Sequence, residues 1–471
     1  MNSNLLALLS TLQAQNGPLS PEILKNLETQ MIQAGNSPSQ SGIQSGSRSV
    51  ISLDTLQQNN KKKRVLLVGT HIQQFTGYSK VTYNIVKYLA KKPDVELHHY
   101  GFQRAKTSIP DYRPYPPNVN SFDAAAMETP VEQGFGYKRL PEVIKQVQPD
   151  VVIIYNDALV VCKFLEEIAK QLNADERRRF KVIVYLDQVY VGQRQMFMEM
   201  IRREASVVFA FTERWRQVLE KQFMGDAPKP RLRVLRHGYS NDLFSELDRS
   251  KIRTALGIPT NGFLMLNLNR NSPRKRYDIL IMAFVELICK YPTKPIFLLC
   301  VCDKGEKGGY SLFDIYLDEL RSRNVVIEQY ANRLMVSNAD MALPDSEINN
   351  LYNAADIGVT TSEGEGFGLC QMEQMGVGIP QVVPDILGLN EFCTAENSVV
   401  IPARNAYHIP IGMGALGGKA FSCDPHEYCL GIEKYLLDSS LREKHGKEAK
   451  KVTQQFVWDN ELKPLYEEIL N

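Results

Sequence analysis

Short apolar runs alternate with amphipathic stretches from about residue 64 to the end of the chain. A run without polar alternation is typical of a strand buried on both faces of a parallel sheet, and apolar positions at helical spacing predict a helix. Predicted strands cover residues 65–68, 96–100, 151–155, 182–186, 207–210 and 233–235, then 263–266, 296–301, 325–328, 357–360 and 381–383. Predicted helices cover residues 79–91, 140–146, 160–172, 194–204, 214–223, 279–290, 312–323 and 458–470. The alternation predicts a doubly wound α/β protein, whose ligands bind beyond the carboxyl ends of the strands.

Three stretches lack this pattern. Residues 1–60 include a Ser-, Gly- and Gln-rich segment and are predicted to form a low-complexity, largely disordered arm. Residues 101–136 contain several prolines and are predicted to form a long surface loop. Residues 409–418 are glycine-rich and are also expected to be a loop.

Composition narrows the class of protein. A length of 471 residues suits two or three domains, and the break at His237-Gly238 separates a unit at 61–238 from one at 239–455. The 44% hydrophobic and 23% charged content is that of a globular protein, and a net charge of +2 gives no argument for nucleic acid as a partner. The cysteines lack the spacing of zinc sites, and Cys300-x-Cys302 indicates two small residues in a buried strand.

Targeting signals are not evident either. No apolar run reaches the ~18 residues of a membrane span, and the N-terminus does not resemble a signal peptide. We therefore expect no transmembrane segment and a cytoplasmic location.

The stretch from Ser362 to Glu373 combines glycines with carboxylates at a strand-to-helix turn. Backbone amides and a helix N-terminus at such a turn suit a phosphate. Glu365 falls in the loop and Glu373 lies about two turns into the helix, where carboxylates could meet hydroxyl groups. The combination suggests a nucleotide-sugar. The alternative is simple charge complementation of the helix end, which is the favoured interpretation for Glu363.

A basic cluster follows the strand at 263–266. Its members are Arg270, Arg274, Lys275 and Arg276. Arginine offers a planar fork and lysine a point charge, and together they suit a diphosphate, although a solvated charge cluster is the alternative.

Other polar residues lie at predicted strand ends. Gly77 lies in a loop before a helix that Ser79 is expected to cap, and it is a second candidate phosphate contact. Asp187 follows the strand at 182–186. His237 is either a catalytic base or, as we favour, a structural residue between the two units.

These motifs resemble the retaining glycosyltransferases of family 4. The run Glu365-Gly-Phe-Gly-Leu-x-x-x-Glu373 matches the family's Glu-x7-Glu motif, and Arg270 with Lys275 matches its Arg/Lys pair. The resemblance covers about residues 64–471, and details around the two motifs look closest to glycosyltransferases encoded by giant DNA viruses.

The resemblance implies a GT-B architecture, with two facing doubly wound (Rossmann-like) domains and an interdomain cleft. Residues 61–238, completed by a C-terminal helix at 456–471, would form the acceptor domain, and 239–455 would bind the nucleotide-sugar. The implied donor-site residues are Gly77, Arg270, Lys275, Gly366, Phe367, Gly368, Leu369 and Glu373. Among them Arg270, Lys275 and the amides of Gly368 and Leu369 would meet the diphosphate, and Glu373 the ribose.

The implied catalytic residues are Glu365, at the donor sugar, together with Arg270 and Lys275. Many family members carry a histidine after a strand of the first domain, and Asp187 is the candidate substitute here. The resemblance implies no metal and no cofactor, and the sequence has no convincing Asp-x-Asp pair.

The predicted function is that of a metal-independent retaining glycosyltransferase that moves a hexose to a glycan, protein or small-molecule acceptor. The donor would be of the GDP-mannose or UDP-glucose type. A catalytically silent nucleotide-sugar-binding or scaffold protein of the same fold, and a GT-B nucleotide-sugar epimerase, remain alternatives. If the gene is viral, the location would be the host cytoplasm.

Overall fold

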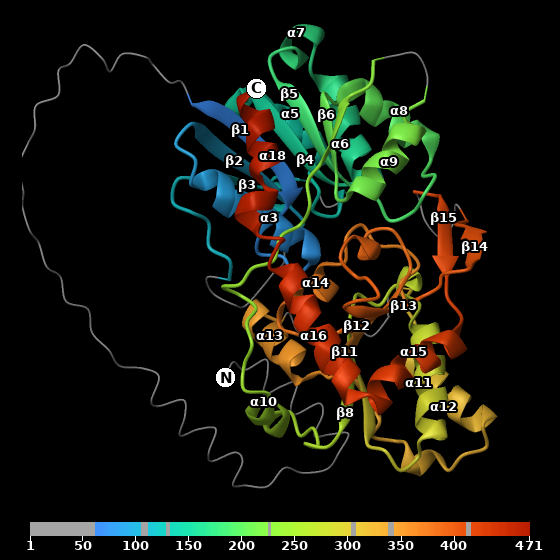
Figure 1. Ribbon diagram of the computed structural model, residues 1–471. Helices are drawn as coiled ribbons and strands as arrows, with labels where there is room; N and C mark the ends of the chain where they lie inside the picture. The colour runs from blue at the N-terminus through green and yellow to red at the C-terminus, as the bar shows by residue number, and fades with distance from the viewer. Residues whose placement is uncertain are drawn as a thin grey trace, which may run out of the picture. The chain divides into compact units, whose positions relative to one another are not determined.

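A computed structural model (Figure 1) describes residues 62–104, 112–128, 132–224, 228–302, 308–337, 343–410 and 416–471. The predicted arm at 1–60 lies outside these residues. The described part from Lys63 onward forms one compact unit that contains two parallel sheets, which we call the first and second lobes. Within the described residues, no helix is both long enough and apolar enough to cross a bilayer.

The first lobe is built on a parallel sheet in the order β3-β2-β1-β4-β5-β6-β7. Its strands are β1 (Lys63–Thr70), β2 (Val95–Phe102), β3 (Asn120–Asp123), β4 (Val151–Asp157), β5 (Lys181–Asp187), β6 (Val207–Ala210) and β7 (Arg231–Val234). Its helices are α3 (Gly77–Ala90), α4 (Ala124–Met127), α5 (Leu140–Val147), α6 (Ala158–Gln171), α7 (Ala174–Arg177), α8 (Gln195–Glu204) and α9 (Glu213–Gln222).

The second lobe has the order β10-β9-β8-β11-β12-β13, again parallel. Its strands are β8 (Phe263–Leu268), β9 (Ile296–Val301), β10 (Leu334–Val336), β11 (Ile357–Val359), β12 (Gln381–Pro384) and β13 (Ser398–Ile401). Its helices are α10 (Arg249–Ala255), α11 (Tyr277–Lys290), α12 (Leu312–Ser322), α13 (Asp345–Ala354), α14 (Leu369–Gly376), α15 (Pro425–Leu437) and α16 (Ser439–Thr453). An antiparallel hairpin of β14 (Asn405–His408) and β15 (Lys419–Ser422) follows β13.

The central strands are buried on both faces, as their continuous apolar runs predict. Leu66 in β1 and Met265 in β8 are fully buried, each in the core cluster of its own lobe. Cys300 and Cys302 are also buried, which confirms that they are small residues in the core around β9. The doubly wound fold expected from the sequence is confirmed.

The chain ends on the first lobe. Helices α17 (Trp458–Glu461) and α18 (Lys463–Leu470) follow α16, and α18 packs against β1. The buried carboxylate of Glu468 accepts from Lys181 at 3.0 Å and from Arg231 at 2.8 Å, at the start of β5 and β7. The domain boundaries proposed from the sequence stay a proposal.

Some local predictions were wrong. The predicted strand at 325–328 is a 3-10 turn at Ile327–Gln329. Val326 is 57% exposed, so its apolar side chain is not buried against a sheet and does not favour a strand. The strand at that edge of the sheet is β10. The segment predicted as a loop at 101–136 includes β3 and α4. Each has only four residues, which is too short to show the period of a strand or a helix.

The order of the strands places the functional candidates. In each sheet the order reverses beside the first strand, between β1 and β4 and between β8 and β11. Loops that leave neighbouring strands in opposite directions open a crevice at that point, and ligands of doubly wound sheets bind there. The loops after β1, β8 and β11 carry the residues that the sequence singled out.

Candidate functional site

The turn between β11 and α14 is shaped for close approach. Gly368 precedes α14 with a φ of 101°, which favours glycine, and a Cβ there would collide with Leu389. No side chain caps the start of α14. Its first backbone amides, including that of Leu369, have no side-chain cap and could donate to an anion. The positive end of the helix dipole would favour that anion.

Glu365 and Lys275 are in direct contact, although they come from loops after different strands. The Lys275 ammonium donates to Glu365 Oε1, and Arg274 Nη1 lies 3.3 Å from Oε2. Burial alone would raise the pKa of Glu365, but Lys275 and Arg274 outweigh it and hold the pKa at about 2. Glu365 is a carboxylate at neutral pH.

Arg270 lies apart from this pair. It is exposed beyond the end of β8 and makes no hydrogen bond or ion pair with any residue that the structure describes. Arg274 instead lies beside Glu365. The structure therefore brings Lys275 to the glutamate of the motif, and does not bring Arg270 there.

Glu363 and Arg276 form a neighbouring structural contact. Arg276 donates to Glu363, and Tyr407 of β14 donates to the other carboxylate oxygen. Glu363 is buried before α14 rather than exposed in its first turn. Its role is to hold the turn after β8 and the β14–β15 hairpin to this loop.

Glu373 is fully enclosed on α14. Lys80 of α3 donates to Oε1 at 2.6 Å, and Tyr352 of α13 donates to Oε2 at 2.8 Å. Burial alone would lower the pKa of Lys80, but Glu373 and Asp345 outweigh it and raise it. Lys80 therefore carries its charge into the interface between the two lobes.

A second ion pair joins the lobes next to this one. Arg113, in the loop before β3, donates to both carboxylate oxygens of Asp345, at 3.0 Å and 3.1 Å. Lys80 lies 3.5 Å from the same carboxylate. We call Lys80, Arg113, Asp345 and Glu373 the interlobe ion cluster; all four side chains are buried.

The first lobe contributes Gly77, Tyr78 and Asp187. Gly77 is the first residue of α3, which Thr76 caps rather than Ser79; Ser79 completes a capping box with Thr76. The Tyr78 hydroxyl donates to Asp187 Oδ2 at 2.5 Å. A Cβ on Gly366 would collide with Asp187 Oδ1, so the end of β5 lies directly against the glycine loop of the second lobe.

His237 and Phe367 are structural. The His237 ring packs at 4.9 Å from Phe367 and 4.3 Å from Phe211, and Tyr185 lies 2.7 Å from its Nδ1. Burial lowers the pKa of His237 to about 3, so it is neutral at physiological pH. These contacts favour the structural interpretation of His237, and they place the buried Phe367 ring in the same aromatic cluster.

Sequence reasoning missed several of these residues. Lys80 lies among the buried positions of α3, and an unpaired lysine there would be costly, which is the signal that could have found it. Arg113 lies in a segment without periodicity and offered no such signal. Tyr78 follows Gly77 directly and was overlooked because a loop tyrosine is unremarkable by itself.

The assembled side chains offer cations, a free helix start and two enclosed carboxylates. Lys275 and Arg274 could neutralise a polyanion, and Glu365 and Asp187 could accept from hydroxyl groups. In the part of the chain that the structure describes, no group of three or more His, Cys, Asp and Glu side chains could hold a metal ion.

Comparison with known proteins agrees with this chemistry. Residues 248–410 match the model of the family described as "Glycosyl transferases group 1". The chain is 27% identical over 265 residues to a D-inositol 3-phosphate glycosyltransferase of Acidothermus cellulolyticus, which covers 55% of this chain and 52% of the relative. A relative of the same name from Corynebacterium urealyticum is 27% identical over 248 residues, 51% of each chain. The chain thus spans about half the length of these curated relatives.

Solved structures show the same fold. Sucrose-phosphate synthase from Thermosynechococcus elongatus matches with a TM-score of 0.65 at 15% identity, over 87% of this chain and 99% of that one. HepE of Anabaena, solved in complex with UDP-glucose, matches with a TM-score of 0.61 at 17% identity, over 86% and 99%. The GT-B fold expected from the resemblance is confirmed, and the family match supports the group 1 glycosyltransferases. These comparisons leave the narrower viral resemblance a prediction.

Proposed function

We propose that this protein is a retaining glycosyltransferase that moves a hexose from a nucleotide diphosphate sugar to an acceptor, without a metal ion. The observation that carries the proposal is the contact between Lys275 and Glu365 at the reversal point of the second sheet. Diphosphate and sugar are joined by one bond in such a donor. Two side chains in contact can therefore serve the two halves of one ligand.

Lys275 and Arg274 would stabilise the leaving group. As the bond from the sugar to the diphosphate breaks, negative charge grows on the leaving oxygen and positive charge on the sugar. Lys275, Arg274 and the first amides of α14 stabilise the former, and Glu365, which keeps its charge, stabilises the latter. Arg270, exposed beyond the end of β8, would join them only after a side-chain movement.

The remaining residues would position the donor. Glu373 would accept from the ribose hydroxyls, and Tyr352 already fixes one of its oxygens. Lys80 occupies the other, so the ribose would share or replace that contact. From the first lobe, Gly77 would approach the diphosphate and Asp187 the reacting sugar, in place of the histidine of many family members.

Retention follows from the resemblance to family 4, and both UDP-glucose and GDP-mannose types remain candidate donors. The UDP-glucose complex of HepE favours testing uridine donors first. The relatives named D-inositol 3-phosphate glycosyltransferases suggest phosphorylated polyols among the acceptors to be tried. The oligomeric state and the cytoplasmic location stay predictions.

The test is turnover of a panel of nucleotide-sugars by the full chain, followed as release of nucleoside diphosphate with and without acceptors. We expect Lys275→Ala and Glu373→Ala each to lower kcat/KM by about 100-fold or more, because each removes a charge-assisted contact to the donor. The matched control is Lys251→Ala, which removes an exposed lysine of α10 paired with Asp248 at 3.3 Å. It should keep wild-type activity.

Undiminished turnover in both site variants would contradict the site assignment. Nucleotide binding without turnover over the whole acceptor panel would instead favour the silent binding protein. Interconversion of two sugars on the same nucleotide would favour the epimerase.

A further inference from the structure

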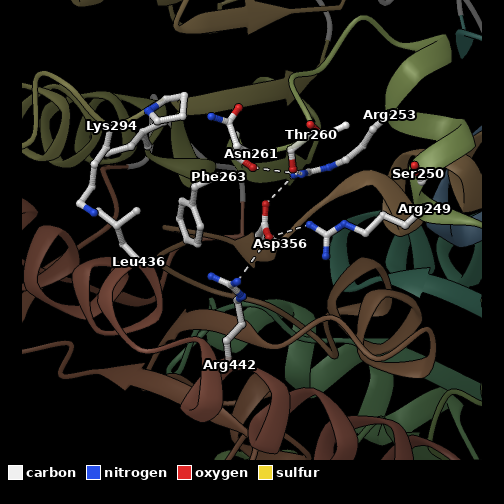
Figure 2. Close-up of a pocket in the computed structure, with 13 residues that line it drawn as sticks. Arg249, Ser250, Arg253, Thr260, Asn261, Phe263, Lys294, Asp356, Leu436 and Arg442 are labelled. Atoms are coloured by element: carbon white, nitrogen blue, oxygen red, sulfur yellow. Dashed lines mark hydrogen bonds and ion pairs between the residues drawn. The ribbon is translucent and has the colours of Figure 1, made fainter.

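A cavity of about 630 Å³ opens at the amino ends of the strands of the second sheet (Figure 2). It is lined by the residues that precede β8, β9 and β11, together with α10, α15 and α16. Because the proposed donor site lies at the carboxyl ends of β8 and β11, the cavity lies at the amino ends of the same strands. The cavity and the proposed donor site therefore lie at opposite ends of the same strands.

The lining of this cavity holds an excess of positive charge. Its cations are Arg249, Arg253, Lys294 and Arg442, and its one carboxylate is Asp356. Figure 2 shows three guanidinium groups, from α10 and α16, directed at Asp356. With every charge counted, the lining carries three more positive charges than negative ones.

Arg253 is committed to the fold. Its guanidinium donates to Asp356 at 2.6 Å and to the carbonyls of Ala354 and Gly262 at 2.9 Å and 3.0 Å. Asp356 also accepts from the Leu264 amide. This buried pair anchors α10 to the sheet and needs no ligand.

Arg249 and Arg442 supply positive charge that the cavity does not neutralise. Arg249 Nη2 lies 2.6 Å from Asp356 Oδ1, but its side chain is 40% exposed. Arg442 is farther from the carboxylate, at 3.8 Å, and donates its other nitrogen to the Tyr435 carbonyl at 2.9 Å. One carboxylate already neutralised by Arg253 cannot balance two more guanidinium groups. The two guanidinium groups repel each other and also repel Arg253. Burial lowers the pKa of Arg253, and Arg249 and Arg442 lower it further, although Asp356 opposes the change.

The cavity also has an apolar side. Phe263 lies under the Arg442 guanidinium at 5.4 Å from its ring centre, and Pro295 and Leu436 continue this surface. A cavity of this size with a few convergent polar groups is typical of a small-molecule site. A bare inorganic ion would leave most of it unfilled.

We propose that this cavity binds a phosphate monoester, with its dianionic phosphate between Arg249 and Arg442 and its organic part against Phe263 and Leu436. A dianion balances the two excess guanidinium groups, which a monovalent carboxylate does not. Guanidinium forks match the oxygens of a phosphate, and Lys294 at the rim adds to the attraction. The site is independent of the proposed glycosyl transfer.

The test is calorimetric titration of the full chain with inorganic phosphate and with phenyl phosphate, at constant pH and ionic strength. We expect saturable binding of both, with phenyl phosphate the tighter ligand. Arg249→Gln and Arg442→Gln should each weaken it about tenfold, since each removes a charge-assisted hydrogen bond. Leu436→Ala should remove the preference for phenyl phosphate.

Matched controls separate this site from general effects of charge. Lys251→Gln on α10 and Lys451→Gln on α16 remove the same charge from exposed lysines paired with Asp248 and Glu448. Both should bind phosphate as the wild type does. Circular dichroism without ligand checks that each variant folds; Arg249→Gln leaves Arg253 on Asp356.

Lys275→Ala distinguishes this site from the donor site. The Lys275→Ala variant should keep the phosphate binding that Arg249→Gln and Arg442→Gln weaken. If binding is lost in Lys275→Ala, or is equal in wild type, Arg249→Gln and Arg442→Gln, the proposal is overturned. Neither result bears on donor turnover, which is measured separately.

Discussion

Asp187, at the end of β5, is half-buried, and Tyr78 donates to one of its carboxylate oxygens. The other oxygen, against Gly366, has no hydrogen-bond partner among the described residues. Burial raises its pKa from 3.8 to about 6, although the Tyr78 hydrogen bond opposes the rise. Since the folded chain holds this proton more tightly than the unfolded chain, stability falls as pH rises from about 4 to about 6. The loss at neutral pH is about 3 kcal/mol.

Asp187→Asn should therefore stabilise the protein. The amide oxygen can still accept from Tyr78, and no charge is buried. We expect the free energy of unfolding at pH 7.5 to rise by up to about 3 kcal/mol, with the gain vanishing near pH 4. Urea unfolding across this pH range measures it, and Asp318→Asn, an exposed carboxylate of α12, should change stability little at any pH. A gain at pH 4 equal to that at pH 7.5 would contradict the buried-charge explanation.

At the scale of single residues, the sequence was most useful where chemistry depends on residue type. Glu365, Glu373 and Lys275 were identified before any contact was known. Their partners were not, because the patterns around residue 80 and residue 113 contain no information about what packs against them. The emphasis on Arg270 rather than Arg274 came from spacing within a motif, which does not determine where a long side chain ends.

At the scale of elements, we expect the first residue of α3, Gly77, to be required for ligand binding rather than for folding. Thr76 caps the helix, and a Cβ on Gly77 would meet only Leu369 Cδ2, at 3.9 Å. No contact among the residues that the structure describes requires glycine at this position. A close approach by a ligand would require it, because a methyl group there would cover the amide.

Gly77→Ala should keep or slightly raise the melting temperature, because alanine is the better helix former. We expect its affinity for a nucleotide diphosphate to fall about tenfold, as loss of one charge-assisted contact would produce. Gly366→Ala is the contrast: its Cβ would collide with Asp187 and lie 3.0 Å from the Phe211 ring, so its melting temperature should fall. Thermal melts and nucleotide titrations of both variants measure this. Unchanged nucleotide affinity in a folded Gly77→Ala would remove Gly77 from the donor site.

At the scale of the whole described unit, the interlobe ion cluster joins two sheets that are each complete by themselves. Lys80 bonds Glu373 and approaches Asp345, and Arg113 covers Asp345 from the other side. Enclosed pairs of this kind are weakly screened by salt. Removing one partner leaves an uncompensated charge, which typically costs about 3 kcal/mol or more.

Lys80→Met should therefore destabilise the protein by about 3 kcal/mol at pH 8. The loss should be smaller at pH 5, because burial raises the pKa of Glu373 and, without Lys80, that carboxyl can take up a proton. Lys87→Met on the same helix is the control, since Lys87 makes an exposed pair with Asp242 at 3.4 Å. Urea unfolding at both pH values and at two salt concentrations checks this. Equal losses in the two variants would mean that the cluster adds nothing to stability.

The sequence by itself determined the class of fold, and it indicated the strand ends at which the candidate site is proposed. Burial on both faces leaves a continuous apolar run, and a crossover helix leaves its own period, so the elements of a doubly wound sheet are visible locally. Glycines and charges after those runs marked the carboxyl ends of β1, β8 and β11. The edge strands β3, β10 and β13 were not predicted, because strands of three or four residues are too short to carry much of that pattern.

Only the tertiary structure decided which charges meet. Lys80 and Glu373 are 293 positions apart and belong to different sheets, and their contact depends on how the two lobes pack. The same holds for Asp187 against Gly366, and for the three arginines around Asp356 at the amino ends of the strands of the second sheet. Periodicity records whether a residue is buried, whereas its electrostatic partner is chosen by packing between segments that are distant in sequence.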